Sequence, residues 1–256
     1  MLAAGHGGYM REYKNYIFDL YGTLVDIRTN ENKISLWKNM AQIFSMMGAF
    51  YTGTELKGKY KALVQEEGLQ SLQKAREKFQ EGHLAREDAE ICLENVFQRL
   101  LAEKGVCAGE QCLSQTGLVF RSLSLEYIRL FEGVPELLAR LREGGKRIYL
   151  LSNAQRMFTQ PEMKMLGIYG CFDGILYSSD EGVKKPCFYF YDALFKRFGL
   201  LKEESVMIGN EYQADILGAE GYGIDSMYVF TAQSGREALE LPRRCQRLGQ
   251  IGNCYG

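Results

Sequence analysis

The carboxylate of Asp19 is the first side chain in the sequence whose position suggests chemistry. It directly follows a short apolar run at residues 16–18 and precedes a turn-forming glycine, Gly22. Such a run predicts a buried strand that carries a polar residue at its tip. A carboxylate placed there can act as a nucleophile and form a covalent intermediate, and the hydroxyl of Thr23 could orient the transferred group or Asp19 itself. Taken alone, a turn or a helix cap explains this segment about equally well.

Two further polar positions offer groups that could hold an anion. Ser152 and Asn153 follow a second apolar run, at residues 147–151, and could present a hydroxyl and backbone N–H groups to an anion's oxygens. Lys185 stands just before Pro186, at the start of a predicted helix. A cation is expected there if a carboxylate nucleophile or an anionic substrate must be neutralised. The alternatives are a turn or an N-cap for the first pair and a solvated surface position for the lysine.

A fourth group of polar side chains follows the apolar run at residues 205–208. Asn210 and Glu211 come shortly after this run, and Asp215 lies four positions beyond Glu211. Oxygen ligands gathered opposite Asp19 would suit a hard divalent ion such as Mg²⁺. The alternative is that Asp215 caps the helix that follows.

These four groups need a scaffold that brings them together. Five apolar runs predict strands, at residues 16–18, 147–151, 174–177, 205–208 and 225–230. Helical spacing of apolar residues separates several of them, as at 134–141 and 186–198. Repeated strand-helix-strand units imply parallel strands with right-handed crossovers. In such a sheet the ligand site lies beyond the carboxyl ends of the strands, where all four polar groups fall.

The stretch from about residue 29 to residue 127 breaks this alternation and predicts an all-helical insertion. Apolar residues at 86–101 keep one helical face, which predicts a helix there. An aromatic and methionine cluster near the start of the insertion is expected to form the core of the helix bundle, or else to line a substrate pocket. Its members are Trp37, Met40, Phe44, Met46, Met47 and Phe50.

Four such signals in this order, each at a strand tip, resemble the motifs of the haloacid dehalogenase-like (HAD) hydrolase superfamily. Residues 19–23 match motif one, Ser152 motif two, Lys185 motif three and residues 210–215 motif four. The resemblance covers about residues 16–26 and 131–230, and the helical insertion has the position of that family's C1 cap.

The resemblance implies an α/β fold with a doubly wound parallel sheet, a Rossmann-like HAD core, and an inserted all-α cap that roofs the active site. We expect the core at residues 12–28 and 129–235 and the helical cap at 29–128. The terminal segments, 1–11 and 236–256, have no assigned role.

The resemblance also implies roles for individual side chains. Asp19 would be the nucleophile, and Ser152, Asn153 and Lys185 would bind the substrate's anionic group. The candidate catalytic residues are Asp19, Tyr21, Thr23, Ser152 and Lys185. The candidate ligands for Mg²⁺ are Asp19, Tyr21, Asn210, Glu211 and Asp215.

Tyr21 departs from the pattern of the family's phosphatases, which carry a second aspartate there as general acid/base. A tyrosine, with an ordinary pKa of about 10, is poorly suited to protonate a leaving alkoxide and then activate water. The same Asp-x-Tyr-Gly-Thr pattern is typical of the family's 2-haloacid dehalogenases, in which the leaving halide needs no proton and no metal is used.

The fourth motif favours a metal-dependent phosphatase over a dehalogenase. Glu211 and Asp215 would repel Asp19 in the absence of a cation, whereas a bound Mg²⁺ would remove the repulsion and neutralise a phosphoryl group. Asn210 replaces the usual first acid, so Glu211 could substitute for it as a ligand. Arg28 and Arg76 are candidates for a halide or carboxylate clamp, and neither can be placed from the sequence.

We therefore expect a Mg²⁺-dependent phosphatase acting on a small phosphorylated metabolite. The alternatives are metal-free hydrolysis of a carbon–halogen bond and, as a different class, a catalytically weak binding module. Loss of the acid/base at Tyr21 and the change to Asn210 favour the binding module, and turnover abolished by Asp19→Asn would exclude it.

Overall composition limits the partners. The formal net charge of −1 gives no general attraction to nucleic acid or to an anionic membrane. No run of about 18 apolar residues occurs, and the seven cysteines lack the spacing of a disulfide or zinc framework. We expect a soluble cytoplasmic protein that binds a small anionic molecule; its oligomeric state is not predicted.

Overall fold

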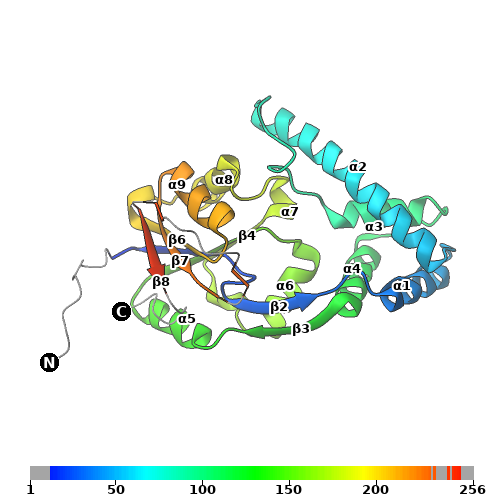
Figure 1. The fold of residues 1–256 in the computed structure, drawn as a ribbon, viewed down its shortest axis with the longest axis horizontal. Coiled ribbons are helices and arrows are strands. Elements are labelled where there is room, and N and C mark those ends of the chain that lie inside the picture. Colours follow the sequence, from blue (N-terminus) through cyan, green and yellow to red (C-terminus); the bar gives the residue numbers. More distant parts are fainter. Residues whose placement is uncertain (1–11, 232, 235–240, 243, 249–256) are drawn as a thin grey trace.

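The computed structural model describes residues 12–231, 233–234, 241–242 and 244–248 (Figure 1). The terminal segment at 1–11 and most of the segment at 236–256 lie outside the described residues.

A parallel sheet of six strands, in the order β5-β4-β1-β6-β7-β8, forms the centre of the core. Its strands are β1 (Asn15–Phe18), β4 (Arg147–Ser152), β5 (Gly174–Tyr177), β6 (Ser205–Gly209), β7 (Asp225–Val229) and β8 (Cys245–Leu248). The five apolar runs of the sequence are thus five strands of one sheet, and their predicted ends differ from the observed ones by a single residue at most. The sixth strand, β8, comes from the C-terminal segment that had no predicted role.

Helices cover both faces of this sheet. Successive side chains of a strand point to opposite faces, and β1 shows this directly. Phe18 packs with α5 (Val134–Glu143) and α6 (Arg156–Met165) in one hydrophobic cluster, whereas Ile17 packs with α8 (Phe188–Phe198) and α9 (Gly218–Tyr222) in another. The other helical segments of the core are η1 (Tyr169–Cys171), α7 (Ser178–Glu181), η2 (Lys202–Glu204) and η3 (Tyr212–Leu217). The predicted fold class, a doubly wound α/β core, is confirmed.

Four helices form the insertion on the right of Figure 1: α1 (Ile34–Met46), α2 (Gly53–Phe79), α3 (Leu93–Ala102) and α4 (Glu110–Ser124). Trp37, Met40 and Phe44 are buried in the shared core of these helices, whereas the side chains of Met46 and Phe50 are exposed. The aromatic and methionine cluster is therefore largely helix-bundle core. The helices are joined to the sheet through β2 (Val25–Thr29) and β3 (Leu125–Leu130), an antiparallel ribbon that the sequence did not predict.

The predicted helix over residues 86–101 is wrong in its first half, because α3 begins only at Leu93. Residues 84–92, which we call the docking segment, leave the helical bundle and lie against the core. Ala89 forms an antiparallel bridge with Val183, and the N–H of Glu90 donates to the carbonyl of Gly182 at 3.0 Å. Ala89 is buried by this contact with the core rather than on the face of a helix.

The end of α2 also reaches the core. In Figure 1 this long helix runs back from the other cap helices toward α7 and α8. Ala75 near its end packs in one cluster with Val183 and Phe190 of the core. The helical insertion thus touches the core at the docking segment and at α2 as well as through the β2–β3 ribbon.

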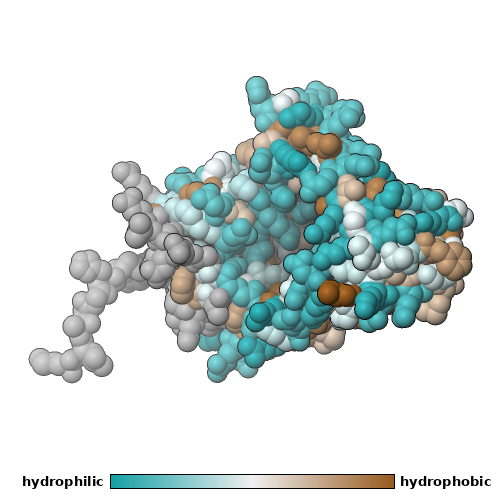
Figure 2. Space-filling model, turned by 45° about the vertical axis from the view of Figure 1, so that its right-hand side comes forward, coloured by the Kyte–Doolittle hydropathy of each residue, from teal (hydrophilic) through white to brown (hydrophobic). Residues whose placement is uncertain are grey.

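Hydrophilic residues cover most of the face shown in Figure 2, with only small hydrophobic areas between them. Among the described residues, none of the helices is long and apolar enough to cross a membrane.

Candidate active site

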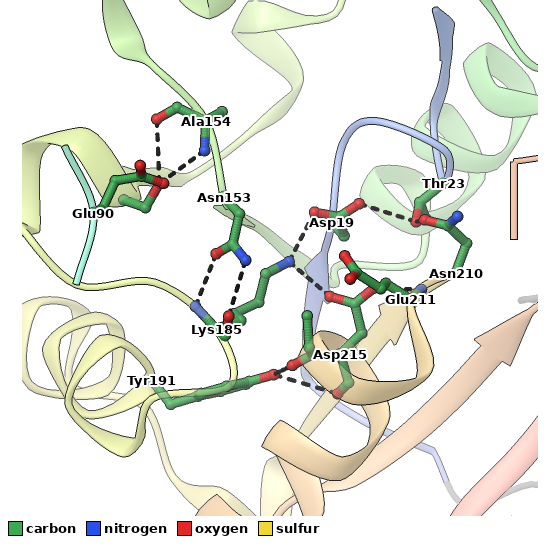
Figure 3. A network of polar contacts seen from close by, with 12 residues as sticks. Asp19, Thr23, Glu90, Asn153, Ala154, Lys185, Tyr191, Asn210, Glu211 and Asp215 are labelled. Atoms are coloured by element: carbon green, nitrogen blue, oxygen red, sulfur yellow. Dashed lines mark hydrogen bonds and ion pairs between the residues drawn. The ribbon is translucent and has the colours of Figure 1, made fainter. Parts of the chain in front are cut away.

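The carboxyl ends of β1, β4 and β6 lie side by side at one edge of the sheet and carry Asp19, Ser152 and Asn210. Figure 3 shows Asp19 and Asn210 at this edge, with Lys185 and Asp215 close by. Asp19, directly after β1, is 8% exposed, and Ser152 and Asn210 are also buried. The backbone N–H of Asp19 donates to the carbonyl of Ile208 on β6 at 2.9 Å, which fixes the start of the following turn. The sequence thus brings residues far apart in the chain to one buried edge.

Lys185 occupies the centre of this site. Its Nζ lies 2.7 Å from Oδ1 of Asp19 and 2.7 Å from Oδ1 of Asp215, and its side chain is 1% exposed. Burial alone would lower the pKa of Lys185, but the two carboxylates outweigh burial and hold this pKa above its ordinary value. The ammonium group therefore stays charged and separates two carboxylates that would otherwise repel one another.

Asp215 lies in η3 and is completely buried. Burial raises the pKa of Asp215 to about 7, and the charge of Asp19 acts in the same direction while Lys185 opposes it. Oδ2 of Asp215 accepts a hydrogen bond from the backbone N–H of Glu211 at 2.9 Å. Asp215 therefore links Lys185 to the loop after β6, whereas Glu211 itself is exposed.

Thr23 connects the loops that follow β1 and β6. Its hydroxyl lies 3.3 Å from Oδ2 of Asp19 and 3.1 Å from Oδ1 of Asn210. Gly22 makes this approach possible, since it has a φ of +84° and a Cβ there would lie 2.5 Å from Nδ2 of Asn210. A side chain at position 22 would therefore displace the side chain of Asn210 from Thr23.

Ser152 and Asn153 differ in their hydrogen-bond partners. The hydroxyl of Ser152 is buried and has no hydrogen-bond partner among the described residues, so it is available to a ligand. The side chain of Asn153 accepts from the N–H of Lys185 at 2.8 Å and donates to the carbonyl of Lys185 at 3.0 Å. Its amide group thus holds the backbone of Lys185. The peptide bond that follows, Lys185–Pro186, is cis.

Tyr21 points toward α6. Its hydroxyl donates to the carboxylate of Glu162 and lies 3.0 Å from the hydroxyl of Thr159. Arg121 of α4 completes the cluster with an ion pair to Glu162 at 2.6 Å. Burial, followed by the charge of Glu162, raises the pKa of Tyr21 well above its ordinary value. The phenol therefore keeps its proton near neutral pH.

Sequence reasoning missed Arg121, Thr159 and Glu162, which carry no motif and come from distant helices. It offered Arg28 and Arg76 instead. Arg28 pairs with Glu126 on the surface of the β2–β3 ribbon, and the guanidinium of Arg76 donates to the carbonyl of Leu84.

The sequence profile of the haloacid dehalogenase-like hydrolases matches residues 13–223, most of the chain. The chain belongs to this family of hydrolases. The match includes every residue of the site just described.

Several relatives of this HAD chain are phosphatases. A glyceraldehyde 3-phosphate phosphatase of Methanothermobacter thermautotrophicus is 29% identical over 112 residues, which are 44% of this chain and 50% of that protein. A phosphoserine phosphatase of Thermus thermophilus is 27% identical over 136 residues, 53% of each chain. The chain thus spans about half the length of the curated relatives it matches.

Solved structures of HAD proteins share the fold over nearly the whole chain. A 2-haloacid dehalogenase of Pseudomonas syringae has a TM-score of 0.61 at 18% identity, with 94% of this chain and 96% of that one covered. The HAD hydrolase YfnB of Bacillus subtilis, bound to magnesium, has a TM-score of 0.53 at 18% identity, with 96% and 98% covered. At these identities the likeness shows the fold alone.

The donor set of this HAD site fits a magnesium ion. No three His, Cys, Asp or Glu side chains group as a metal site within the part of the chain that the structure describes. However, Mg²⁺ usually takes only one or two carboxylates and fills the remaining positions with water and phosphate oxygens. The carboxylate of Asp19 and the amide oxygen of Asn210, which both contact the Thr23 hydroxyl, would supply one carboxylate ligand and one neutral oxygen ligand. The phenol of Tyr21 is bonded to Glu162 and Thr159 of α6 instead, so this phenol would not be a ligand.

Proposed function

We propose that this HAD hydrolase is a Mg²⁺-dependent phosphatase of small phosphorylated metabolites. The observation that carries the proposal is the buried ammonium group of Lys185 beside the Asp19 carboxylate, at a sheet edge where the buried hydroxyl of Ser152 has no partner among the described residues. A phosphoryl group needs a cation and hydrogen-bond donors around its oxygens next to the attacking atom. The phosphatase activities named for the relatives support the same choice.

In this proposal Asp19 attacks phosphorus, the bond to the leaving oxygen breaks, and an aspartyl phosphate forms. Lys185 holds the Asp19 carboxyl group in place, and with Ser152 it binds the phosphoryl oxygens. Water then attacks phosphorus, releases orthophosphate and restores Asp19. When bound, Mg²⁺ would neutralise charge on the phosphoryl group. Tyr21 keeps its proton, so the proton for the leaving oxygen comes from another group.

Dehalogenase chemistry is the second candidate because of Tyr21. A halide leaves without taking up a proton, so the protonated phenol of Tyr21 would not hinder this reaction. A catalytically weak binding module, favoured by Tyr21 and Asn210, is the third candidate.

The experiment is an assay of the purified protein against a generic aryl phosphate and 2-chloropropionate, each with Mg²⁺ and with EDTA. Phosphate release that requires both Mg²⁺ and Asp19, with Asp19→Asn as the inactive variant, is the expected result. Chloride release that EDTA does not affect would replace this proposal by the dehalogenase. No turnover of either substrate would favour the binding module.

A further inference from the structure

We propose that Glu90, in the docking segment of the cap, is a positioning residue for the phosphate-binding loops of the core. This inference rests on the proposed function, since it assigns Glu90 a task in that same site. Neither Glu90 nor its partner Ser178 belongs to any of the four motifs.

The first contact runs from Glu90 to the loop after β4. The hydroxyl of Ser178 donates to Oε2 of Glu90 at 2.8 Å and accepts from the backbone N–H of Ala154 at 2.8 Å. Figure 3 shows Glu90 close to Ala154, on the side of Asn153 and Lys185. Ala154 is only two residues beyond Ser152, whose hydroxyl is free to bind a ligand. Glu90 is thereby connected, through one buried serine, to the loop that presents Ser152 and Asn153.

The second contact runs from the same segment to the loop that carries Lys185. The N–H of Glu90 donates to the carbonyl of Gly182 at 3.0 Å, and the N–H of Lys184 donates to the carbonyl of Asp88 at 2.9 Å. Lys185, the next residue, is held from the other side by the Asn153 side chain. The Lys185 loop is therefore fixed between the core and the cap.

The chemistry of a carboxylate explains why Glu90 suits this task. A carboxylate oxygen accepts hydrogen bonds, and the single proton of the Ser178 hydroxyl has two acceptors within reach. Oε2 of Glu90 at 2.8 Å is closer than the carbonyl oxygen of Ala154 at 3.4 Å, so the proton points to Glu90. The lone pairs of that hydroxyl are then directed at the N–H of Ala154. A hydrogen bond to a charged partner is stronger than a neutral one, which makes this orientation the stable one.

A third contact keeps the docking segment in register. The side-chain amide of Gln155 donates to the carbonyl of Ile91 at 2.9 Å and accepts from the N–H of Leu93 at 2.9 Å. Gln155 directly follows Ala154, so a side chain of the same loop is bonded directly to the backbone of the cap. Removal of the Glu90 carboxylate should leave the segment attached but release the orientation of Ser178.

The test compares Glu90→Ala, Glu90→Gln and Ser178→Ala with a matched control, Lys78→Ala. Lys78 forms a cap–core contact at the same boundary, from its ammonium group to Oε2 of Glu181 at 3.2 Å and to the carbonyl of Glu181 at 3.0 Å. It forms no hydrogen bond to residues 152–155 or to Lys184 and Lys185 among the described residues. For each variant we would measure kcat and KM for an aryl phosphate, and the affinity for orthophosphate by calorimetry.

We expect Glu90→Ala and Ser178→Ala to lower kcat by about tenfold or more, because small misplacements of reacting groups cost up to about a hundredfold. Both should also weaken orthophosphate binding several-fold. Glu90→Gln keeps an acceptor oxygen and should recover most of the activity, and Lys78→Ala should match the wild type. A merely structural role for Glu90 would lower the thermal stability of Glu90→Ala and Ser178→Ala while their kcat and phosphate affinity stayed at the values of Lys78→Ala.

The inference is overturned if Glu90→Ala folds and has the kcat and phosphate affinity of Lys78→Ala. If Glu90→Ala does not fold, the same comparison is made with Ser178→Ala. A wild type that binds orthophosphate but hydrolyses no phosphate ester overturns the proposed function instead. In that case the comparison of orthophosphate affinities alone decides the role of Glu90.

Discussion

The ammonium group of Lys185 lies 2.7 Å from Oδ1 of Asp19, and both side chains are almost completely buried. A second carboxylate, Asp215, lies at the same distance from this ammonium group. One buried ammonium group thus lies between two buried carboxyl groups, and in the proposed mechanism the reactivity of Asp19 depends on where Lys185 is held.

Lys185→Met should therefore damage both activity and stability. It leaves the carboxylates of Asp19 and Asp215 facing one another without a cation, and breaking a buried ion pair costs about 3–5 kcal/mol. We expect kcat to fall by about a hundredfold or more, measured by phosphate release, and the urea midpoint to fall as well. A variant with wild-type kcat would show that Lys185 has only a structural role.

Asn153→Ala tests whether this amide positions the lysine or binds the substrate. The structure shows both ends of the Asn153 amide bonded to the backbone of Lys185. Loss of these bonds should lower kcat by about tenfold with little change in KM. A large rise in KM at unchanged kcat would instead support the original expectation that Asn153 contacts the substrate.

Tyr21→Phe should leave the pH dependence of kcat unchanged between about pH 5 and pH 9. The pKa of Tyr21 is raised by burial and by Glu162, so its phenol stays protonated at pH values up to and beyond its ordinary pKa of about 10. The contribution of this raised pKa to the free energy of unfolding is fully present below about pH 10 and declines only at higher pH. Loss of the hydrogen bond to Glu162 should cost about 1–3 kcal/mol in urea unfolding. A basic or acidic limb that disappears in Tyr21→Phe would identify Tyr21 as an acid/base group.

Arg121 and Glu162 join a cap helix to a core helix, and their side chains are only 14% and 9% exposed. Arg121→Met and Glu162→Gln should each destabilise the protein by about 3–5 kcal/mol, because each leaves one buried charge without its partner. The double variant should lose less than the sum of the two single losses. Urea unfolding of all four proteins would measure this coupling, and strict additivity would contradict it.

The sequence predicts the sheet well because buried parallel strands are short apolar runs. A polar residue with a possible chemical role ends β4 and directly follows β1 and β6. The ribbon of β2 and β3 escapes prediction because most side chains of β3 are exposed or half-buried and show no apolar alternation. The docking segment escapes for another reason. Ala89 fits a helical period, and only the fold brings Val183, its partner in the bridge, beside it.

The residues of the site also differ in whether the sequence predicts them. Asp19 and Lys185 are predictable because each stands at an element boundary beside a turn or a proline. Glu162 is not, because it is 141 positions from Tyr21 in the sequence and lies within an ordinary amphipathic helix. Contacts of this kind depend on how the cap meets the core, and local sequence patterns carry no information about that.

The central claim is that Asp19 carries the phosphoryl group, and acid-quenched mass spectrometry during turnover tests it most directly. The protein would be mixed with an aryl phosphate and Mg²⁺, quenched within the first turnovers and digested. We predict a phosphoryl group on the peptide that contains Asp19, removable by hydroxylamine and missing in Asp19→Asn. Turnover at an undiminished rate in Asp19→Asn, with no phosphoryl group on that peptide, would contradict the account.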